Sequence, residues 1–165
     1  MQIKQVSYGN PDASKLISEV QQEYVVRYGG PDGTPVDPAE FIPPSGLFLV
    51  GYLDGAPVAC GGWRGYRADT GSATETSATE TKAAEIKRMY VTPAARHRGL
   101  ARQLLAELER SAAVAGHRRV ILESGSAQPE AIALYRSSGY TPIPPFGHYA
   151  DANGAVHLGK DLTAD

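Results

Sequence analysis

"VTPAARHRGLARQLL" (Val91–Leu105) is the stretch that decides how the rest of the sequence is interpreted. It links the apolar segment AAEIKRMYV (83–91) to the amphipathic run GLARQLLAELERSAAVAG (99–116), so it predicts a strand, a turn and a helix in direct succession. The helix is expected to bury a stripe of leucines and to turn most of its charged residues to water. The leucines are Leu100, Leu104, Leu105 and Leu108, and the charged residues are Arg102, Glu107, Glu109 and Arg110.

The start of this predicted helix has an unusual charge. A helix N-terminus carries partial positive charge and favours acidic residues, yet Arg96, His97 and Arg98 stand there. Gly99 has no Cβ, so main-chain N–H groups at that point can approach a ligand closely. The basic residues are therefore explained if an anion such as a phosphate group completes the site. The turn lacks both the glycine–lysine pattern of a nucleotide P-loop and the three-glycine pattern of a dinucleotide site.

Three motifs carry a resemblance to a known family. The turn RHRGLA (96–101) matches Gln/Arg-x-x-Gly-x-Gly/Ala and resembles the coenzyme A pyrophosphate loop of the GNAT superfamily, the general N-acetyltransferases. The preceding AEIKRMYVTP (84–93) resembles the family's fourth strand, and EAIALYRSSGY (130–140) resembles its second motif, a short helix with a tyrosine followed by Gly-aromatic. The resemblance covers the chain from about Gly46 to Leu162.

The resemblance implies an α/β (α+β) fold with a mixed, mostly antiparallel central sheet of about six to seven strands flanked by helices. The sequence pattern supports this order of elements. The expected strands are 2–6, two within 47–66 joined at LDGAP, 83–91, 118–124, 140–145 and 155–162, and the expected helices are 11–30, 99–116 and 128–139.

The resemblance also implies that the protein moves an acetyl group by direct transfer from acetyl-CoA, the co-substrate, to a primary amine of a small molecule, a peptide or a protein. Gln128 stands where the family often has an asparagine, so its side-chain amide is expected to contact the cofactor. The expected cofactor-binding residues are Met89, Tyr90, Val91, Arg96, His97, Arg98, Gly99, Leu100, Ala101 and Gln128.

Acetyl transfer to an amine calls for a base and an acid. An alkylamine has a pKa of about 10.4 in water, so it must lose a proton before it can attack. Glu85 stands where some family members have a catalytic glutamate, while Glu123, water, or a purely structural pairing of Glu85 with Lys87 are the alternatives. Tyr135 matches the family's general-acid tyrosine and would protonate the leaving thiolate. Main-chain N–H groups near Met89 would meet the developing oxyanion.

Composition limits the other functions. The 165 residues suit one domain spanning 1–165, and 16 basic against 18 acidic residues give a net charge of -2, which disfavours a nucleic-acid or anionic-membrane surface. With no apolar leader or membrane-length run, a cytoplasmic protein is expected. Cys60, the single cysteine, predicts a small buried residue, and four scattered histidines predict no metal site. The composition leaves a homodimer open.

Two segments lie outside the motifs. The tandem repeat SATETSATET (72–81) has no large apolar residue and predicts a flexible insertion at about 70–82. The proline-rich segment 31–46 carries Asp32, Asp37 and Glu40, which suit a cationic amine, and His148 lies in a second loop that could line the acceptor mouth. A non-catalytic acyl-CoA-binding sensor is the alternative function.

Overall fold

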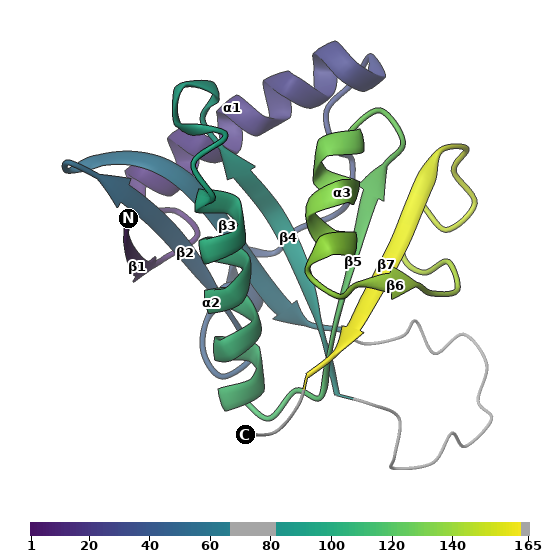
Figure 1. Ribbon diagram of the computed structural model, residues 1–165. Helices are drawn as coiled ribbons and strands as arrows, with labels where there is room; N and C mark the ends of the chain where they lie inside the picture. The colour runs from purple at the N-terminus through teal and green to yellow at the C-terminus, as the bar shows by residue number, and fades with distance from the viewer. Residues whose placement is uncertain (67–81, 163–165) are drawn as a thin grey trace.

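The computed structural model describes residues 1–66 and 82–162, and the SATET repeat lies outside them. Within this part of the chain, seven strands form one sheet in the order β1-β2-β3-β4-β5-β7-β6 (Figure 1). The strands are β1 (Gln2–Val6), β2 (Gly46–Leu53), β3 (Ala56–Gly65), β4 (Ala83–Val91), β5 (Arg119–Gly125), β6 (Thr141–Pro142) and β7 (Ala155–Asp161). The helices are α1 (Pro11–Tyr28), α2 (Leu100–Val114) and α3 (Pro129–Ser137), with short 3-10 turns η1 (Pro38–Phe41) and η2 (Pro93–Ala95).

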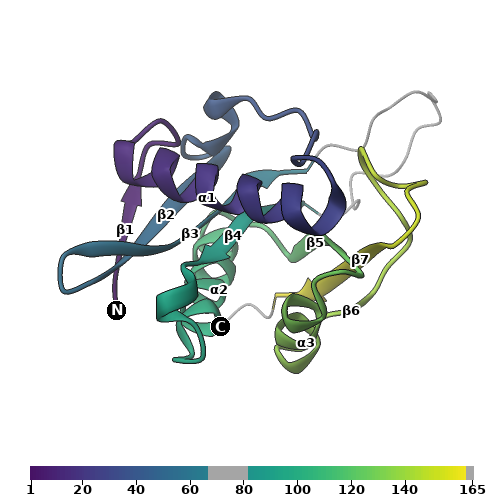
Figure 2. The same ribbon diagram turned by 90° about the horizontal axis from the view of Figure 1, so that it is seen from above.

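Helices cover both faces of the sheet. Helix α1 lies across one face, and α2 and α3 lie on the other (Figure 2). Successive residues of a strand point to opposite faces, so Leu47 and Leu49 of β2 pack in the α2 core, whereas Phe48 and Val50 pack in the α1 core. The fold is therefore the expected one, a mixed and mostly antiparallel sheet flanked by helices.

Local sequence signals account for the helix ends. The side chain of Asn10 accepts from the N–H of Asp12 and Ala13 at the start of α1, and Gly29 ends that helix in the left-handed conformation with φ 79°. The predicted leucine stripe of α2 is buried throughout. Cys60 is also fully buried, as expected for a small strand residue.

Two details of the sequence prediction are wrong. Glu109 does not face water, because Lys160 Nζ lies 2.6 Å from its Oε2 and its side chain is only 14% exposed. The segment 140–145 forms a ladder only at Thr141 and Pro142, since the prolines that follow lack the N–H that a ladder requires.

The arrangement of β4 and β5 positions the site. Among the described strands, they form the one parallel pair, and their pairing is confined to Ala83–Arg119, Ala84–Val120 and Glu85–Ile121. Beyond Glu85 the two strands diverge, and α1 crosses the sheet above them (Figure 1). The second half of β4 therefore has main-chain groups and side chains on an edge that β5 does not cover.

Candidate active site

A β-bulge interrupts β4 where it separates from β5. Gly62 of β3 pairs with Lys87 and Cys60 pairs with Tyr90, so Arg88 and Met89 together face one residue of β3. Arg88 adopts φ +58°, which is uncommon for a residue with a side chain. Bulges leave a residue unpaired and redirect its neighbours. The main chain around Met89 therefore departs from a regular ladder.

The turn after β4 leaves the start of α2 uncapped. Gly99 has φ +74° and precedes α2 without any side-chain cap, so the first N–H groups of this helix lack partners within it. A Cβ built on Gly99 would meet no heavy atom within 4 Å. The positive end of α2 therefore opens into free space, which is the geometry of an anion-binding helix start.

This space belongs to a cleft of about 350 Å³ that contains nearly all the predicted cofactor residues. Every one of them except Arg98 lines the cleft, and Tyr135 lines it as well. Arg98 is exposed and lies outside the lining. The predicted residues found there are Met89, Tyr90, Val91, Arg96, His97, Gly99, Leu100, Ala101 and Gln128.

Arg96 is held at the edge of the cleft. Its Nε donates to the carbonyl of Val91 at 3.0 Å, and its guanidinium carbon lies 5.7 Å from the ring centre of Tyr90. Its Nη2 is ion-paired with Glu23, which reaches in from α1 and also lines the cleft. The positive charge of Arg96, which the sequence analysis expects to bind an anion, is therefore partly balanced by the carboxylate of Glu23. No spacing in the sequence predicts this pair, because its members are 73 residues apart.

Tyr135 enters the same cleft from α3. Its side chain is buried at 7% exposure, and its ring centre lies 5.6 Å from that of Tyr140. Burial raises the pKa of the Tyr135 hydroxyl. The hydroxyl therefore keeps its proton at neutral pH, which a proton donor needs.

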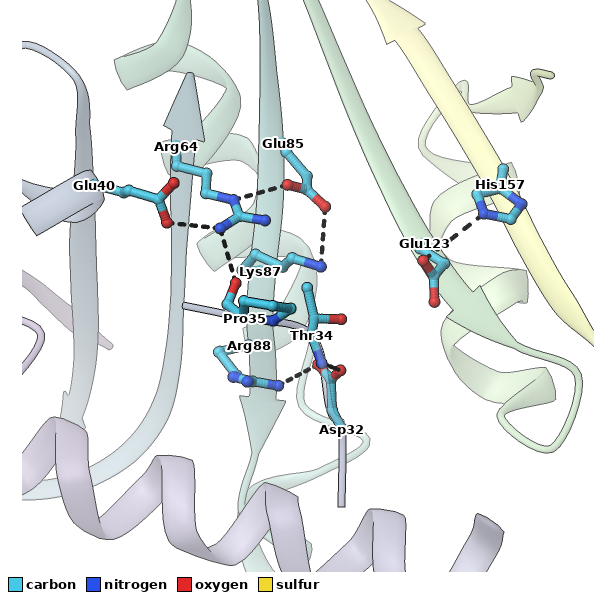
Figure 3. Close-up of polar contacts among 10 residues, drawn as sticks. All are labelled: Asp32, Thr34, Pro35, Glu40, Arg64, Glu85, Lys87, Arg88, Glu123 and His157. Carbon is cyan, nitrogen blue, oxygen red and sulfur yellow. Dashed lines mark hydrogen bonds and ion pairs between the residues drawn. The ribbon is translucent and has the colours of Figure 1, made fainter. Parts of the chain in front are cut away.

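Glu85 lies in a buried ion-pair network beside the bulge (Figure 3). Its Oε2 accepts from Arg64 Nε at 2.8 Å, its Oε1 lies 2.9 Å from Lys87 Nζ, and its side chain is 5% exposed. Arg64 also pairs with Glu40 at 2.6 Å. Both carboxylate oxygens of Glu85 are engaged by Arg64 and Lys87. Glu85 does not line the cofactor cleft, nor the second cavity described below.

Glu123 has a different environment on β5. Burial, together with the negative charges of Asp32 and Glu85, raises the pKa of its carboxyl to about 7, although Lys87 opposes this shift. Its Oε2 lies 3.7 Å from Nε2 of His157, the residue opposite it on β7 (Figure 3). A carboxyl with a pKa near 7 can take up and release a proton at neutral pH.

Glu123 lines a second cavity of about 410 Å³, which shares Gln128 with the cofactor cleft. We name it the acceptor cavity. It lies between the end of α1, the residues after α1, the end of β5 and the segment before β7. Tyr28 Oη donates to Gln128 Oε1 at 3.2 Å on the border of the two spaces.

The predicted acceptor residues are only partly brought together. Asp32 lines the acceptor cavity, whereas Asp37 caps η1 and Glu40 pairs with Arg64. His148 packs against Tyr149 with ring centres 4.6 Å apart, and it is Tyr149 that lines the cavity.

Sequence reasoning missed the tyrosines that line this cavity. Tyr24 and Tyr28 follow Leu16 and Val20 at four-residue spacing, which predicts a continuous buried stripe. Leu16 and Val20 are buried in the core and Tyr24 packs against it, but Tyr24 and Tyr28 also line the cavity, and Tyr28 is exposed.

Two further observations concern the described residues alone. Across 1–66 and 82–162, no three His, Cys, Asp or Glu side chains are grouped so as to hold a metal ion. In the same ranges, no helix combines the length and the apolar character needed to cross a membrane.

Comparison with known proteins agrees with this geometry. The model of the acetyltransferase (GNAT) family matches residues 15–140. An "IAA acetyltransferase" of Azospirillum brasilense is 33% identical over 148 residues, covering 90% of this chain and 89% of that protein. A Klebsiella pneumoniae structure assigned as an acyl-CoA N-acyltransferase superposes with a TM-score of 0.72 at 25% identity, covering 98% of this chain and 97% of the other.

A GNAT family acetyltransferase from Elizabethkingia anophelis, solved with acetyl-CoA bound, has a TM-score of 0.63 at 15% identity and shares the fold over 98% of this chain and 97% of its own. The family match spans most of the chain, and the relative from Azospirillum brasilense exceeds 30% identity over nearly its whole length. The chain therefore belongs to the GNAT acetyltransferase family.

Proposed function

We propose that the protein transfers an acetyl group directly from acetyl-CoA to a primary amine. One observation carries the proposal: the cleft beside the β4 bulge gathers the open, uncapped start of α2, Arg96 and Tyr135. The Elizabethkingia anophelis relative binds acetyl-CoA on the same fold, which supports acetyl-CoA as the co-substrate. The N–H groups after Gly99 and the side chain of Arg96 would hold its pyrophosphate, and the main chain near Met89 would hold the pantetheine arm.

We assign the general base to Glu123 rather than to Glu85. Glu85 is committed to Arg64 and Lys87, whereas Glu123 faces the acceptor cavity with a pKa of about 7. Glu123 accepts a proton from the acceptor ammonium, directly or through one water, and the freed lone pair of the nitrogen attacks the thioester carbon. The carbon–nitrogen bond forms at the border of the two cavities, near Gln128.

Tyr135 acts as the acid in the second half of the reaction. The carbonyl oxygen gains negative charge during attack, and main-chain N–H groups near Met89 stabilise it. When the carbon–sulfur bond breaks, the Tyr135 hydroxyl gives its proton to the departing sulfur. The nitrogen still carries two protons after the attack, and it returns one of them to the Tyr135 oxygen through solvent. Glu123 releases its proton to solvent, which leaves the neutral amide, the free thiol and the starting state of the enzyme.

Acetyl-CoA turnover with a panel of primary amines tests the proposal. Free thiol release and the mass of the acetylated product should rise together in the presence of an acceptor. Calorimetry with acetyl-CoA alone measures cofactor binding separately. A protein that binds acetyl-CoA but acetylates no amine would be the acyl-CoA sensor instead.

A further inference from the structure

The acceptor cavity has an aromatic wall. Tyr24 and Tyr28 project from the last two turns of α1, with ring centres 6.3 Å apart, and Tyr149, on the segment before β7, lines the same cavity. Tyr149 Oη accepts from the N–H of Gly33 at 2.7 Å, which fixes it against the residues that follow α1. Tyrosine rings accommodate alkyl and aryl groups and attract cations through their faces.

The charged groups that line the cavity are acidic. Its ionisable lining groups besides the tyrosines are the carboxyls of Asp32 and Glu123, and none of the described residues that line it is Lys, Arg or His. Burial alone would raise the pKa of Asp32, but the hydrogen bond from the Thr34 N–H and the charge of Arg88 outweigh burial and lower it. Asp32 is thus a carboxylate at neutral pH, and it lines the cavity from the segment that follows α1.

Three cations around the cavity are already paired. Arg27 donates to the carbonyl of Ala127, which lines the cavity, and is ion-paired with Glu130 at 2.5 Å. Arg88 donates to Asp32 and its side chain is 5% exposed, while Lys87 pairs with Glu85 and its side chain is 8% exposed (Figure 3). A carboxylate in the cavity would face the carboxyls of Asp32 and Glu123, which line it, whereas none of these cations does. It would lose its hydration without gaining a partner, which is strongly unfavourable.

We infer that the acceptor is a small primary amine that carries no anionic group, so that the enzyme acetylates an amine and rejects the corresponding amino acid. The volume of about 410 Å³ is at the lower end of the range for small-molecule sites, which favours a compact acceptor. The ammonium group approaches Glu123, and the alkyl or aryl body lies against the tyrosines. This inference rests on the proposed function.

The test is a set of acceptors that differ in one charge. Phenethylamine, phenylalaninamide and phenylalanine share one ring, and cadaverine, lysinamide and lysine share one alkyl chain. The amides have nearly the bulk of the amino acids without the negative charge, so they separate repulsion from size. Each kcat/KM is expressed per concentration of free base, because the amine pKa values differ. The members of each set that have no carboxylate should exceed the amino acid in kcat/KM by at least tenfold.

A variant isolates the cause of the discrimination. Asp32→Asn leaves the Arg88 guanidinium without its carboxylate partner, so a substrate carboxylate gains a cation to bind. The preference for phenylalaninamide over phenylalanine should then fall at least fivefold. Asp37→Asn is the matched control, since Asp37 belongs to the same loop, caps η1 and does not line the cavity. It should leave the preference unchanged.

The outcomes are distinct. Equal kcat/KM for an amino acid and its amide, or an unchanged preference in Asp32→Asn, overturns the inference and leaves the acetyltransferase activity standing. A peptide with a higher kcat/KM than every small amine overturns the inference that the acceptor is compact. Acetyl-CoA binding with no acetylation of any amine removes the proposed function itself. If Asp32→Asn does not fold, the comparison of amide with amino acid on the unaltered protein decides the question.

Discussion

Glu123 Oε2 lies 3.7 Å from Nε2 of His157, its register partner on β7, and that nitrogen is buried without a hydrogen-bond partner in the described structure. Burial lowers the pKa of His157, so its ring is neutral at neutral pH. A positively charged imidazole would favour the carboxylate form of Glu123, whereas a neutral imidazole does not. This pairing agrees with the raised pKa of about 7 at Glu123.

The first prediction follows from that value. A base acts only when it is deprotonated, so at saturating amine kcat should rise with pH and level off above about 7. Glu123→Gln should lower kcat by roughly a hundredfold and abolish this inflection. The measurement is a profile of kcat from about pH 5.5 to about pH 9, a range that brackets the pKa of Glu123. An inflection that persists in the variant would assign the base to another group.

Stability provides the control for this variant. Because the pKa of Glu123 is raised on folding, the folded chain binds the proton more tightly, and stability is lost as pH rises from the unfolded value towards 7. Glutamine cannot ionise, so Glu123→Gln should melt at least as high as the unaltered protein at pH above about 7. Loss of activity together with a raised or equal Tm separates catalysis from unfolding.

The second prediction concerns Glu85. Its carboxylate balances two largely buried cations, so Glu85→Gln should reduce the free energy of unfolding by about 3 kcal/mol, as when one partner of a buried ion pair is removed. Arg64 keeps Glu40 as a partner, which limits the loss. The folded fraction should retain the pH profile of the unaltered enzyme. A loss of kcat/KM that is largest at low pH would instead make Glu85 the base.

The third prediction concerns the pair Glu23–Arg96, which occupies the edge of the cofactor cleft. A bound pyrophosphate would compete with Glu23 for the guanidinium. Glu23→Gln should therefore tighten acetyl-CoA binding by roughly threefold to tenfold, the effect of removing a competing ion pair worth about 1 kcal/mol. Glu107→Gln, which breaks the exposed pair with Arg110, is the control. Weaker binding in Glu23→Gln would mean that Glu23 orients Arg96.

The fourth prediction tests the anion site. Gly99→Val places a branched side chain in the open space before α2 and should weaken acetyl-CoA binding by at least tenfold in calorimetry, on the order of 1.4 kcal/mol. Gly116→Val is a matched control, because Gly116 also has positive φ and open space around its Cβ but ends α2 rather than starting it. Equal affinities of the two variants would refute the site.

Much of this arrangement follows from local sequence. The bounds of β4 follow from its apolar run, and the leucine period of α2 predicts its buried face. The turn at Gly99 is also local, since the glycine allows its positive φ. These local signals place the residues that we propose for cofactor binding close together, and all of them except Arg98 line one cleft.

The identity of the base could not be predicted in the same way. Glu85 and Glu123 both lie in apolar strands, and we propose different roles for them because only Glu85 is ion-paired with Arg64 and Lys87. The pairing with Lys87 is one of the alternatives that the sequence offers, whereas the pairing with Arg64 is not. The partner Arg64 is 21 residues away from Glu85 along the chain. Such contacts depend on strand register, and no spacing in the sequence encodes them.

The last prediction concerns Tyr135, whose ring lines the cofactor cleft and whose hydroxyl keeps its proton because burial raises its pKa. Tyr135→Phe retains the ring and removes only the proton donor. It should lower kcat by roughly a hundredfold, the low end for general acid catalysis, while the Kd for acetyl-CoA stays within a factor of about two. Tyr140→Phe is the matched control, since Tyr140 is a buried neighbour in the same motif that does not line the cleft. If Tyr135→Phe keeps full kcat while single-turnover measurements show that chemistry limits the rate, the hydroxyl is not the acid, and water must protonate the thiolate.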